Sequence, residues 1–172
     1  TKALLDRVLP PFGNYGNPLD VTAGVTPDGI AAATKAMIDE IIEAYAYTAK
    51  KCEEWGLHGV ELHAAHGYLL HQFVSPVSNQ RTDVYGGSLE NRIRFPLELF
   101  AAVRAAYQGV LGIRISASDW IEGGWTPEET ANFAKQLKPL GCNYVHISSG
   151  GISPEQKIAL GPRYQVPFAK IV

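Results

Sequence analysis

Hydrophobic side chains recur along this chain with two alternating periods, one typical of helices and one typical of strands. From residue 30 to residue 55 they fall every three or four positions, which predicts an amphipathic helix that Gly56 ends. Residues 59–63 then alternate apolar with polar side chains, which predicts a strand. The same succession is predicted twice more, as helices at 88–107 and 126–140, strands at 111–117 and 142–148, and a last helix from Val166. Strands that alternate with helices indicate a parallel sheet with right-handed crossovers.

Local signals support these boundaries. Thr126 is followed by a proline and two glutamates, which is the composition of a capped helix start. Glu90 lies near the start of the preceding helix, where the helix dipole favours an acid. A similar helix entry is predicted at Thr26. Residues 1–28 are rich in proline and glycine, and they predict an ordered excursion loop ahead of the regular elements.

One face of every predicted strand is polar. Because side chains alternate along a strand, the polar face carries Glu61, His63, Arg114, Ser116, Tyr144, His146 and Ser148. Parallel strands that are covered by helices on both faces usually read as continuous apolar runs. The pattern therefore favours an α/β fold in which the polar face points into a (β/α)8 TIM barrel, over an open doubly wound sheet. Such a barrel has eight strands and about 250 residues, so we predict a partial barrel of about three βα units, with 29–172 as its central units.

Composition narrows the function classes. Hydrophobic residues make up 46% of the 172 residues, and 15 basic against 17 acidic side chains give a net charge of −2, which argues against nucleic acid as a partner. Cys52 and Cys142 have neither metal nor redox spacing, which is typical of a reducing compartment. No apolar run approaches the roughly 20 residues of a membrane span. We therefore expect a cytoplasmic protein without a membrane partner.

Ionisable side chains gather where the strand at 59–63 ends. His63 and His66 lie three positions apart, and Tyr68 follows. Two neutral imidazoles can donate N–H bonds to a carbonyl or nitro oxygen, or they can ligate a metal; no further cluster with ligand spacing lies nearby. A phenol is protonated at neutral pH and can give a proton. Arg114 lies in mid-strand between two isoleucines and needs a partner, either Glu61 on the next strand or an anionic ligand.

The order and spacing of these residues closely resemble the old yellow enzyme family of FMN-dependent ene-reductases. The resemblance covers about residues 26–172 and corresponds to the middle of the family's barrel. It is carried by His63, Ala64, Ala65, His66, Gly67 and Tyr68, then Ser75, Pro76, Asn79, Arg81, Asp83, Tyr85, Gly86, Gly87, Ser88, Glu90, Asn91 and Arg92.

The resemblance implies a chemistry. NAD(P)H would reduce FMN, and reduced FMN would pass hydride to a small α,β-unsaturated carbonyl or nitro compound. His63 and His66 would grip the electron-withdrawing group, in a substrate segment that includes Ala64 and Ala65. Tyr68 would protonate the second alkene carbon, and Arg114 would contact the N1–C2=O edge of the flavin. We interpret Asn79, Arg81, Asp83 and Tyr85 as a polar lattice that rigidifies the loop, and His58, His71 and His146 as structural.

Two alternatives stay open at this point: a metal-dependent barrel hydrolase that uses His63 and His66, and a non-catalytic barrel fragment without cofactor. If the 172 residues are the whole molecule, we expect neither tight FMN binding nor turnover, because phosphate sites in this architecture commonly follow later strands. A three-stranded sheet with open edges also invites association, so we expect a homo-oligomer.

Overall fold

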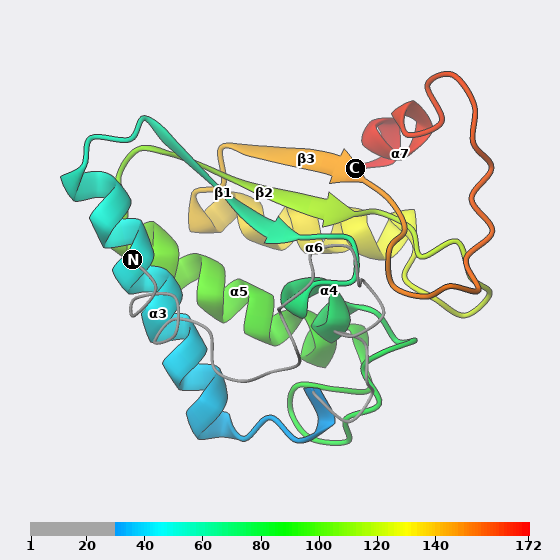
Figure 1. The fold of residues 1–172 in the computed structure, drawn as a ribbon, viewed down its shortest axis with the longest axis horizontal. Coiled ribbons are helices and arrows are strands. Elements are labelled where there is room, and N and C mark those ends of the chain that lie inside the picture. The colour runs from blue at the N-terminus through cyan, green and yellow to red at the C-terminus, as the bar shows by residue number, and fades with distance from the viewer. Residues whose placement is uncertain (1–29) are drawn as a thin grey trace.

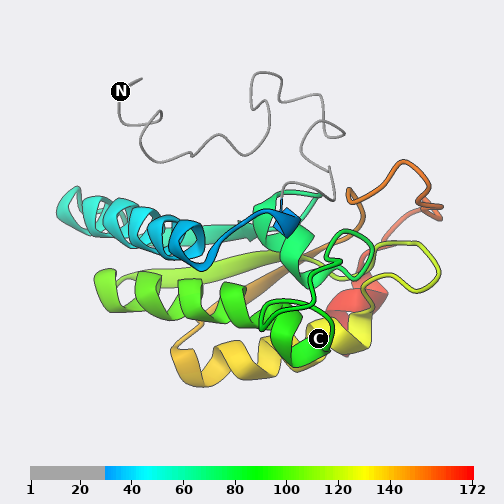
Figure 2. The same cartoon turned by 90° about the horizontal axis from the view of Figure 1, so that it is seen from below.

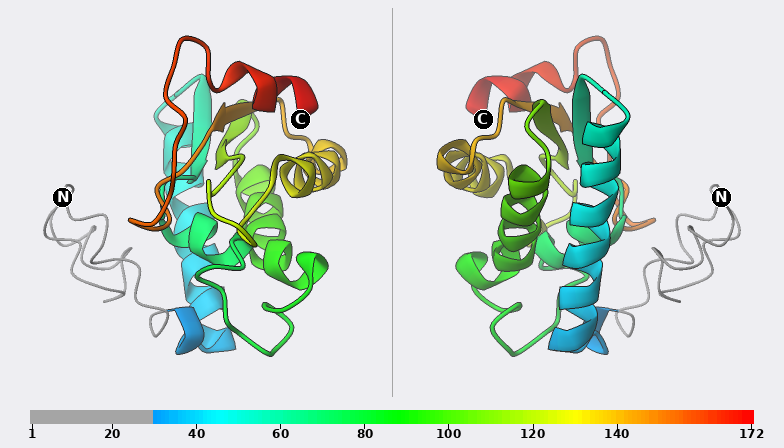
Figure 3. Two further views of the ribbon diagram at one scale, coloured as in Figure 1. Left: turned by 90° about the vertical axis from the view of Figure 1, so that its right-hand side faces the viewer. Right: turned by 90° about the vertical axis from the view of Figure 1, so that its left-hand side faces the viewer.

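The computed structural model describes residues 30–172, and three parallel strands form its single sheet. The strands β1 (Gly59–Ala64), β2 (Val110–Ser116) and β3 (Tyr144–Ser148) lie side by side in chain order. All three end on the same side of the molecule, where the loops that follow them gather (Figure 1). The left view of Figure 3 looks onto this side. The predicted excursion loop and the helix entry at Thr26 lie outside the described residues.

Helices cover one face of the sheet. Figure 2 shows α3 (Lys35–Glu54), α5 (Leu89–Ala106) and α6 (Pro127–Leu137) next to one another in one layer. Leu62 and Ile113 are paired across β1 and β2 and are buried against this layer. At 25 cal/mol per Å², each such side chain stabilises the fold by about 1.5–3 kcal/mol. The predicted apolar phase of the strands is thus confirmed.

Three helix starts follow the capping chemistry of the sequence. Ser88 caps α5, and Thr126 forms a full capping box with Glu129 at the start of α6. The predicted helix from residue 30 is corrected: α3 begins at Lys35, because the side chain of Thr34 accepts a hydrogen bond from the N–H of Met37 and ends the preceding turn. The remaining helices are α4 (Leu69–Val74), the 3-10 helix η1 (Lys138–Leu140) and α7 (Val166–Ile171).

The predicted polar lattice holds the loop between α4 and α5. The N–H of Arg81 donates to the side-chain oxygen of Asn79 at 3.1 Å, and the Arg81 guanidinium donates to Asp83 at 3.0 Å. Asn79 in turn donates to the carbonyl of Tyr85 at 2.8 Å. The hydrogen bond from Arg81 holds the pKa of the Asp83 carboxyl below its usual range. These four residues are structural, as predicted.

Candidate active site

The turn after β1 brings three ring side chains together. The rings of His63 and His66 have centroids 5.3 Å apart, and those of His63 and Tyr68 are 5.1 Å apart. His66 adopts a left-handed backbone conformation with φ 58°, which sharpens the turn and directs its ring beside that of His63. The methyl groups of Ala64 and Ala65 are buried, so the segment presents ring side chains and backbone to its surroundings.

Glycines allow this turn to lie directly against the turn after β3. Gly67 has φ +78°, and a β-carbon there would lie 2.2 Å from the carbonyl oxygen of Gly151. Gly151 has φ +97°, and a β-carbon there would lie 2.4 Å from the Cα of His66. Both positions require glycine because of their φ and because two backbones touch. The location of His66 is therefore fixed by a segment 85 residues away in sequence.

Two inward-facing serines fasten the same turn. The Ser116 hydroxyl accepts from the N–H of His66 at 3.0 Å and donates to the carbonyl of Gly150 at 2.8 Å. The Ser148 hydroxyl lies 2.6 Å from Nε2 of His66. The alternation of the strands placed both serines on the inner face, but it did not indicate that they contact His66.

Both histidines are held neutral. Burial lowers the pKa of His66 to about 4, with further contributions from the charge of Arg114 and from His63. The pKa of His63 is also lowered, first by desolvation and then by Arg114, although the residue is exposed at the sheet surface. A neutral imidazole carries one N–H donor and one acceptor nitrogen. At pH 7 the pair can therefore donate hydrogen bonds to an oxygen without contributing positive charge.

Arg114 faces inward, level with His63 on β1 and His146 on β3, which confirms the predicted strand phase. Its Nε is buried and has no hydrogen-bond partner among the described residues. A buried guanidinium nitrogen without a partner indicates an acceptor supplied from elsewhere. The carbonyl and anionic nitrogen edge of a reduced flavin is such an acceptor, so the residues present fit FMN at this position.

Of the two partners expected for Arg114, Glu61 is wrong. Glu61 contacts His146 instead, with 3.1 Å between Oε2 and Nδ1. The reason is the register: the β2 partner of Glu61 is Gly112, so Arg114 lies one inward position further along the strand. A β-carbon at Gly112 would lie 2.2 Å from the Tyr144 ring, so the glycine leaves room for that ring to lie over β2.

The alternative of a metal site at His63 and His66 would require further ligands close to them. Among residues 30–172, no three or more His, Cys, Asp or Glu side chains converge as metal ligands. Cys52 and Cys142 are both free thiols.

No helix in the described part of the chain combines the length and the apolar character that crossing a bilayer requires.

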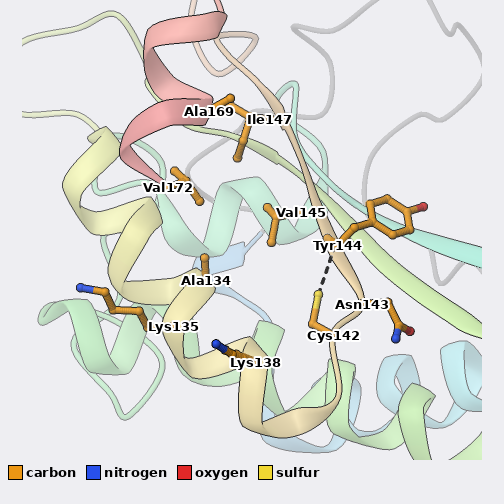
Figure 4. Close-up of a pocket in the computed structure, with 10 residues that line it drawn as sticks. All are labelled: Ala134, Lys135, Lys138, Cys142, Asn143, Tyr144, Val145, Ile147, Ala169 and Val172. Carbon is orange, nitrogen blue, oxygen red and sulfur yellow. Dashed lines mark hydrogen bonds between the residues drawn. The ribbon is translucent and has the colours of Figure 1, made fainter.

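A separate pocket of about 580 Å³ opens on the outer face, between α6, β3 and α7 (Figure 4). Val145 and Ile147 point into it, whereas Tyr144 points to the opposite side of the sheet. The residues that line this pocket include none of His63, His66 and Tyr68. The chemistry of the residues, and not the size of the hollow, therefore identifies the candidate site.

The tryptophans near the rim pack within the protein. Trp125 is 1% exposed and lies with its ring 6.5 Å from that of Phe133. Trp120, in the loop after β2, contacts the ring of Phe168 in α7 at 5.4 Å. Trp125 therefore contributes to the core and not to an open surface.

Sequence reasoning missed Asp119. Its carboxylate is fully buried and is bonded to His71, which the sequence indicated only as structural. Neither residue lies in a strand with a readable phase, and 48 positions separate them, so no local pattern indicated the pair.

Comparison with known proteins finds relatives over most of the chain. A model of the NADH:flavin oxidoreductase / NADH oxidase family matches residues 19–157. The chain is 46% identical over 139 residues to an NADPH dehydrogenase of Geobacillus sp. (strain WCH70), covering 81% of this chain and 41% of that protein. It is 46% identical over 164 residues to an NADH:flavin oxidoreductase of Gibberella zeae, covering 87% and 40%.

Solved structures agree in fold. Morphinone reductase in complex with tetrahydroNAD gives a TM-score of 0.61 at 34% identity, covering 72% of this chain and 35% of that one. The old yellow enzyme homologue from Zymomonas mobilis gives 0.64 at 26% identity, covering 81% and 40%.

The fold is part of a TIM barrel, and the matches place the chain in the class of flavin-dependent oxidoreductase families. The chain belongs to the NADH:flavin oxidoreductase / NADH oxidase family, of old yellow enzyme type, whose cofactors are FMN and NADH or NADPH. It spans about two fifths of the length of the curated relatives it matches, 41% and 40% for the two named above.

Proposed function

We propose that this chain supplies the substrate-activating and proton-donating part of an FMN-dependent NAD(P)H oxidoreductase that reduces activated alkenes. The substrates would be small α,β-unsaturated carbonyl or nitro compounds. The observation that carries the proposal is the convergence of two neutral histidines and one exposed tyrosine at the carboxyl end of β1. The carboxyl ends of the strands are where enzymes with this architecture have their active sites.

His63 and His66 would bind the carbonyl or nitro oxygen of the substrate. As hydride reaches the alkene, negative charge develops on that oxygen, and N–H donors that are already in place stabilise it. Because both imidazoles are neutral, neither gives up its proton to do so. Loss of one such donor typically lowers kcat by about 10²–10³.

Tyr68 would protonate the carbon next to the electron-withdrawing group. Its side chain is 40% exposed, so the hydroxyl is accessible to a bound molecule. Its ring lies 5.1 Å from that of His63, which holds the acid and the oxygen-binding group on the same side of the substrate. A positioned general acid contributes about 10²–10⁴ in rate.

Arg114 would hold the flavin at its N1–C2=O edge through the buried Nε that lacks a partner. When bound, FMN supplies the hydride that it has received from NAD(P)H. The positive charge of Arg114 also contributes to the lowered pKa of both histidines, so one residue serves the cofactor and keeps the oxygen-binding pair neutral.

The test is oxidation of NADPH, without oxygen, by the complete FMN-loaded enzyme to which this chain belongs, in the presence of 2-cyclohexenone, cyclohexanone or cyclohexene. We expect consumption with the enone alone, because only this compound has an alkene conjugated to a group that the histidines can bind. Equal consumption with cyclohexene would contradict the role of the electron-withdrawing group. A flavin that is reduced by NADPH but not reoxidised by the enone would refute the proposal.

The compartment and the assembly are proposed on other grounds. Both cysteines are free, which supports a reducing compartment such as the cytoplasm. The edges of the three-stranded sheet support pairing with further chain, either within a longer barrel or between copies.

A further inference from the structure

A buried histidine–aspartate pair lies beneath the candidate active-site turn and takes no part in the proposed chemistry. The side chains of His71 and Asp119 are both completely buried. Nε2 of His71 lies 2.8 Å from Oδ1 of Asp119. His71 belongs to α4, and Asp119 belongs to the loop after β2, so the pair joins two of the loops at the carboxyl ends of the strands.

The hydrogen bonds assign the protonation of His71. The N–H of Gly67 points at Nδ1 of His71 at 2.9 Å, and a backbone N–H can only donate. Nδ1 must therefore carry a lone pair, and the ring proton lies on Nε2, from which it is donated to the Asp119 carboxylate. His71 is thus the neutral Nε2–H tautomer.

Asp119 is fixed in turn. Its second oxygen, Oδ2, accepts from the Ser75 hydroxyl at 2.6 Å and from the N–H of Trp125 at 2.8 Å. All polar atoms of the pair are consequently satisfied, and a buried network of this kind holds its members in one arrangement. A carboxylate that orients a histidine through one ring nitrogen fixes the tautomer presented by the other.

Gly67, whose N–H donates to His71, lies between two residues with proposed roles in the reaction. Gly67 separates His66 from Tyr68, and it adopts φ +78° directly after the φ 58° of His66. Its carbonyl is held as well, since the Gln72 side chain donates to it at 2.7 Å. Both polar groups of Gly67 are therefore bonded to side chains of α4, although the turn lies outside that helix.

We propose that His71, oriented by Asp119, is a positioning residue: its Nδ1 anchors the Gly67 amide and so sets the directions of His66 and Tyr68 toward the substrate. This inference rests on the proposed function, because it concerns how the same turn is held. It assigns two separable tasks to one ring, an acceptor for the turn and a donor for the aspartate.

Two conservative variants separate these tasks. In His71→Asn, the amide oxygen stands at the same number of bonds from Cα as Nδ1 and can still accept from Gly67. In His71→Gln, the amide nitrogen stands where Nε2 stood and can still donate to Asp119, but the Gly67 amide loses its acceptor. If His71 only stabilises the fold, the phenol affinity and reoxidation rate of each variant should follow its thermal midpoint. If His71 positions the turn, they should depend on whether the variant keeps an acceptor for the Gly67 amide.

The experiment uses the FMN-loaded protein at a temperature well below the unfolding midpoint of every variant. It measures the Kd of a para-substituted phenol, which reports the oxygen-binding pair, and the rate at which 2-cyclohexenone reoxidises the reduced flavin. We expect His71→Gln to be weaker and slower than His71→Asn by about tenfold or more, since an unsatisfied buried donor disturbs the turn. Equal phenol affinities and rates in the two variants would overturn the positioning role.

The tautomer is checked without the flavin chemistry. In protein with ¹⁵N-labelled histidine at pH 7, His71 should show a protonated Nε2 and an unprotonated Nδ1. A proton on Nδ1 would overturn the inference. A wild type that reduces no enone would instead refute the proposed function and the positioning role with it, and the two failures are thus distinguishable.

Discussion

Tyr68→Phe removes one hydroxyl group from the candidate site and leaves the rest of the side chain in place. Tyr68 is 40% exposed, so its hydroxyl is accessible to water in the folded protein. The ring contact with His63 at 5.1 Å is retained in phenylalanine. We therefore expect the free energy of unfolding to change by less than about 0.5 kcal/mol, as for other exposed substitutions.

The effect on the reaction should be far larger, and it should fall on one half of the catalytic cycle. Transfer of hydride from NADPH to the flavin needs no proton from Tyr68, whereas reduction of the alkene leaves a carbon to be protonated. Loss of a general acid lowers a rate by about 10²–10⁴, which is about 3–6 kcal/mol at about 1.4 kcal/mol per tenfold. The activation loss would then exceed the change in stability several times over.

Stopped-flow absorbance of the flavin under anaerobic conditions measures the two halves separately. Reduction by NADPH should match the wild type, and reoxidation by 2-cyclohexenone should slow by about 10²–10⁴. Tyr47→Phe is the matched control, since Tyr47 is 46% exposed on α3, away from the candidate site. Equal slowing of both halves in Tyr68→Phe, or reoxidation at the wild-type rate, would refute the assignment of the proton donor.

Three further outcomes are expected. His63→Ala should weaken phenol binding and lower the rate of enone reduction by about 10²–10³ without changing metal content; activity that chelators abolish and zinc restores would contradict this. Because the pKa of His66 is about 4, below its ordinary value of 6.5, the unfolded chain binds the proton more readily, and stability is lost as pH falls from about 6.5 to about 4. Urea unfolding should show this loss in the wild type relative to His66→Asn, which tolerates a positive φ, and parallel profiles would refute it. Gly67→Ala should destabilise the protein well beyond the roughly 1–2 kcal/mol of a left-handed alanine, because its β-carbon meets backbone, whereas Gly123→Ala, with φ +71° and open space, should show the conformational cost alone. Similar urea midpoints for the two alanine variants would show that the contact at Gly67 is unimportant.

Features that depend on neighbours in sequence could be predicted. The starts of α5 and α6 follow from Ser88 and Thr126, whose side chains meet backbone N–H groups three residues away. The inward face of each strand follows from alternation, and the structure places Arg114 and Ser116 on it as expected. The convergence of His63 with His66 follows from their position at a strand end.

Features that depend on the register between strands could not be predicted from the sequence. Alternation determines which face a side chain occupies but not which residue lies level with it, so it does not indicate that the neighbour of Glu61 on β2 is Gly112 and not Arg114. The contact between Gly67 and Gly151 joins two turns, and its only local signal is the presence of glycine. Buried pairs such as His71 and Asp119 have no period at all, because each lies in a short helix or a loop.

The fate of one deuterium atom tests the central claim most directly. The FMN-loaded protein is given NADPH that carries transferable deuterium at the nicotinamide C4, with 2-cyclohexenone in ordinary water, and the product is examined by mass spectrometry and NMR. We predict cyclohexanone with deuterium on the carbon β to the carbonyl and a solvent-derived hydrogen on the α carbon, because hydride comes through the flavin and the proton comes from Tyr68. Deuterium at the α carbon, or a reduced carbonyl with the alkene intact, would contradict the account.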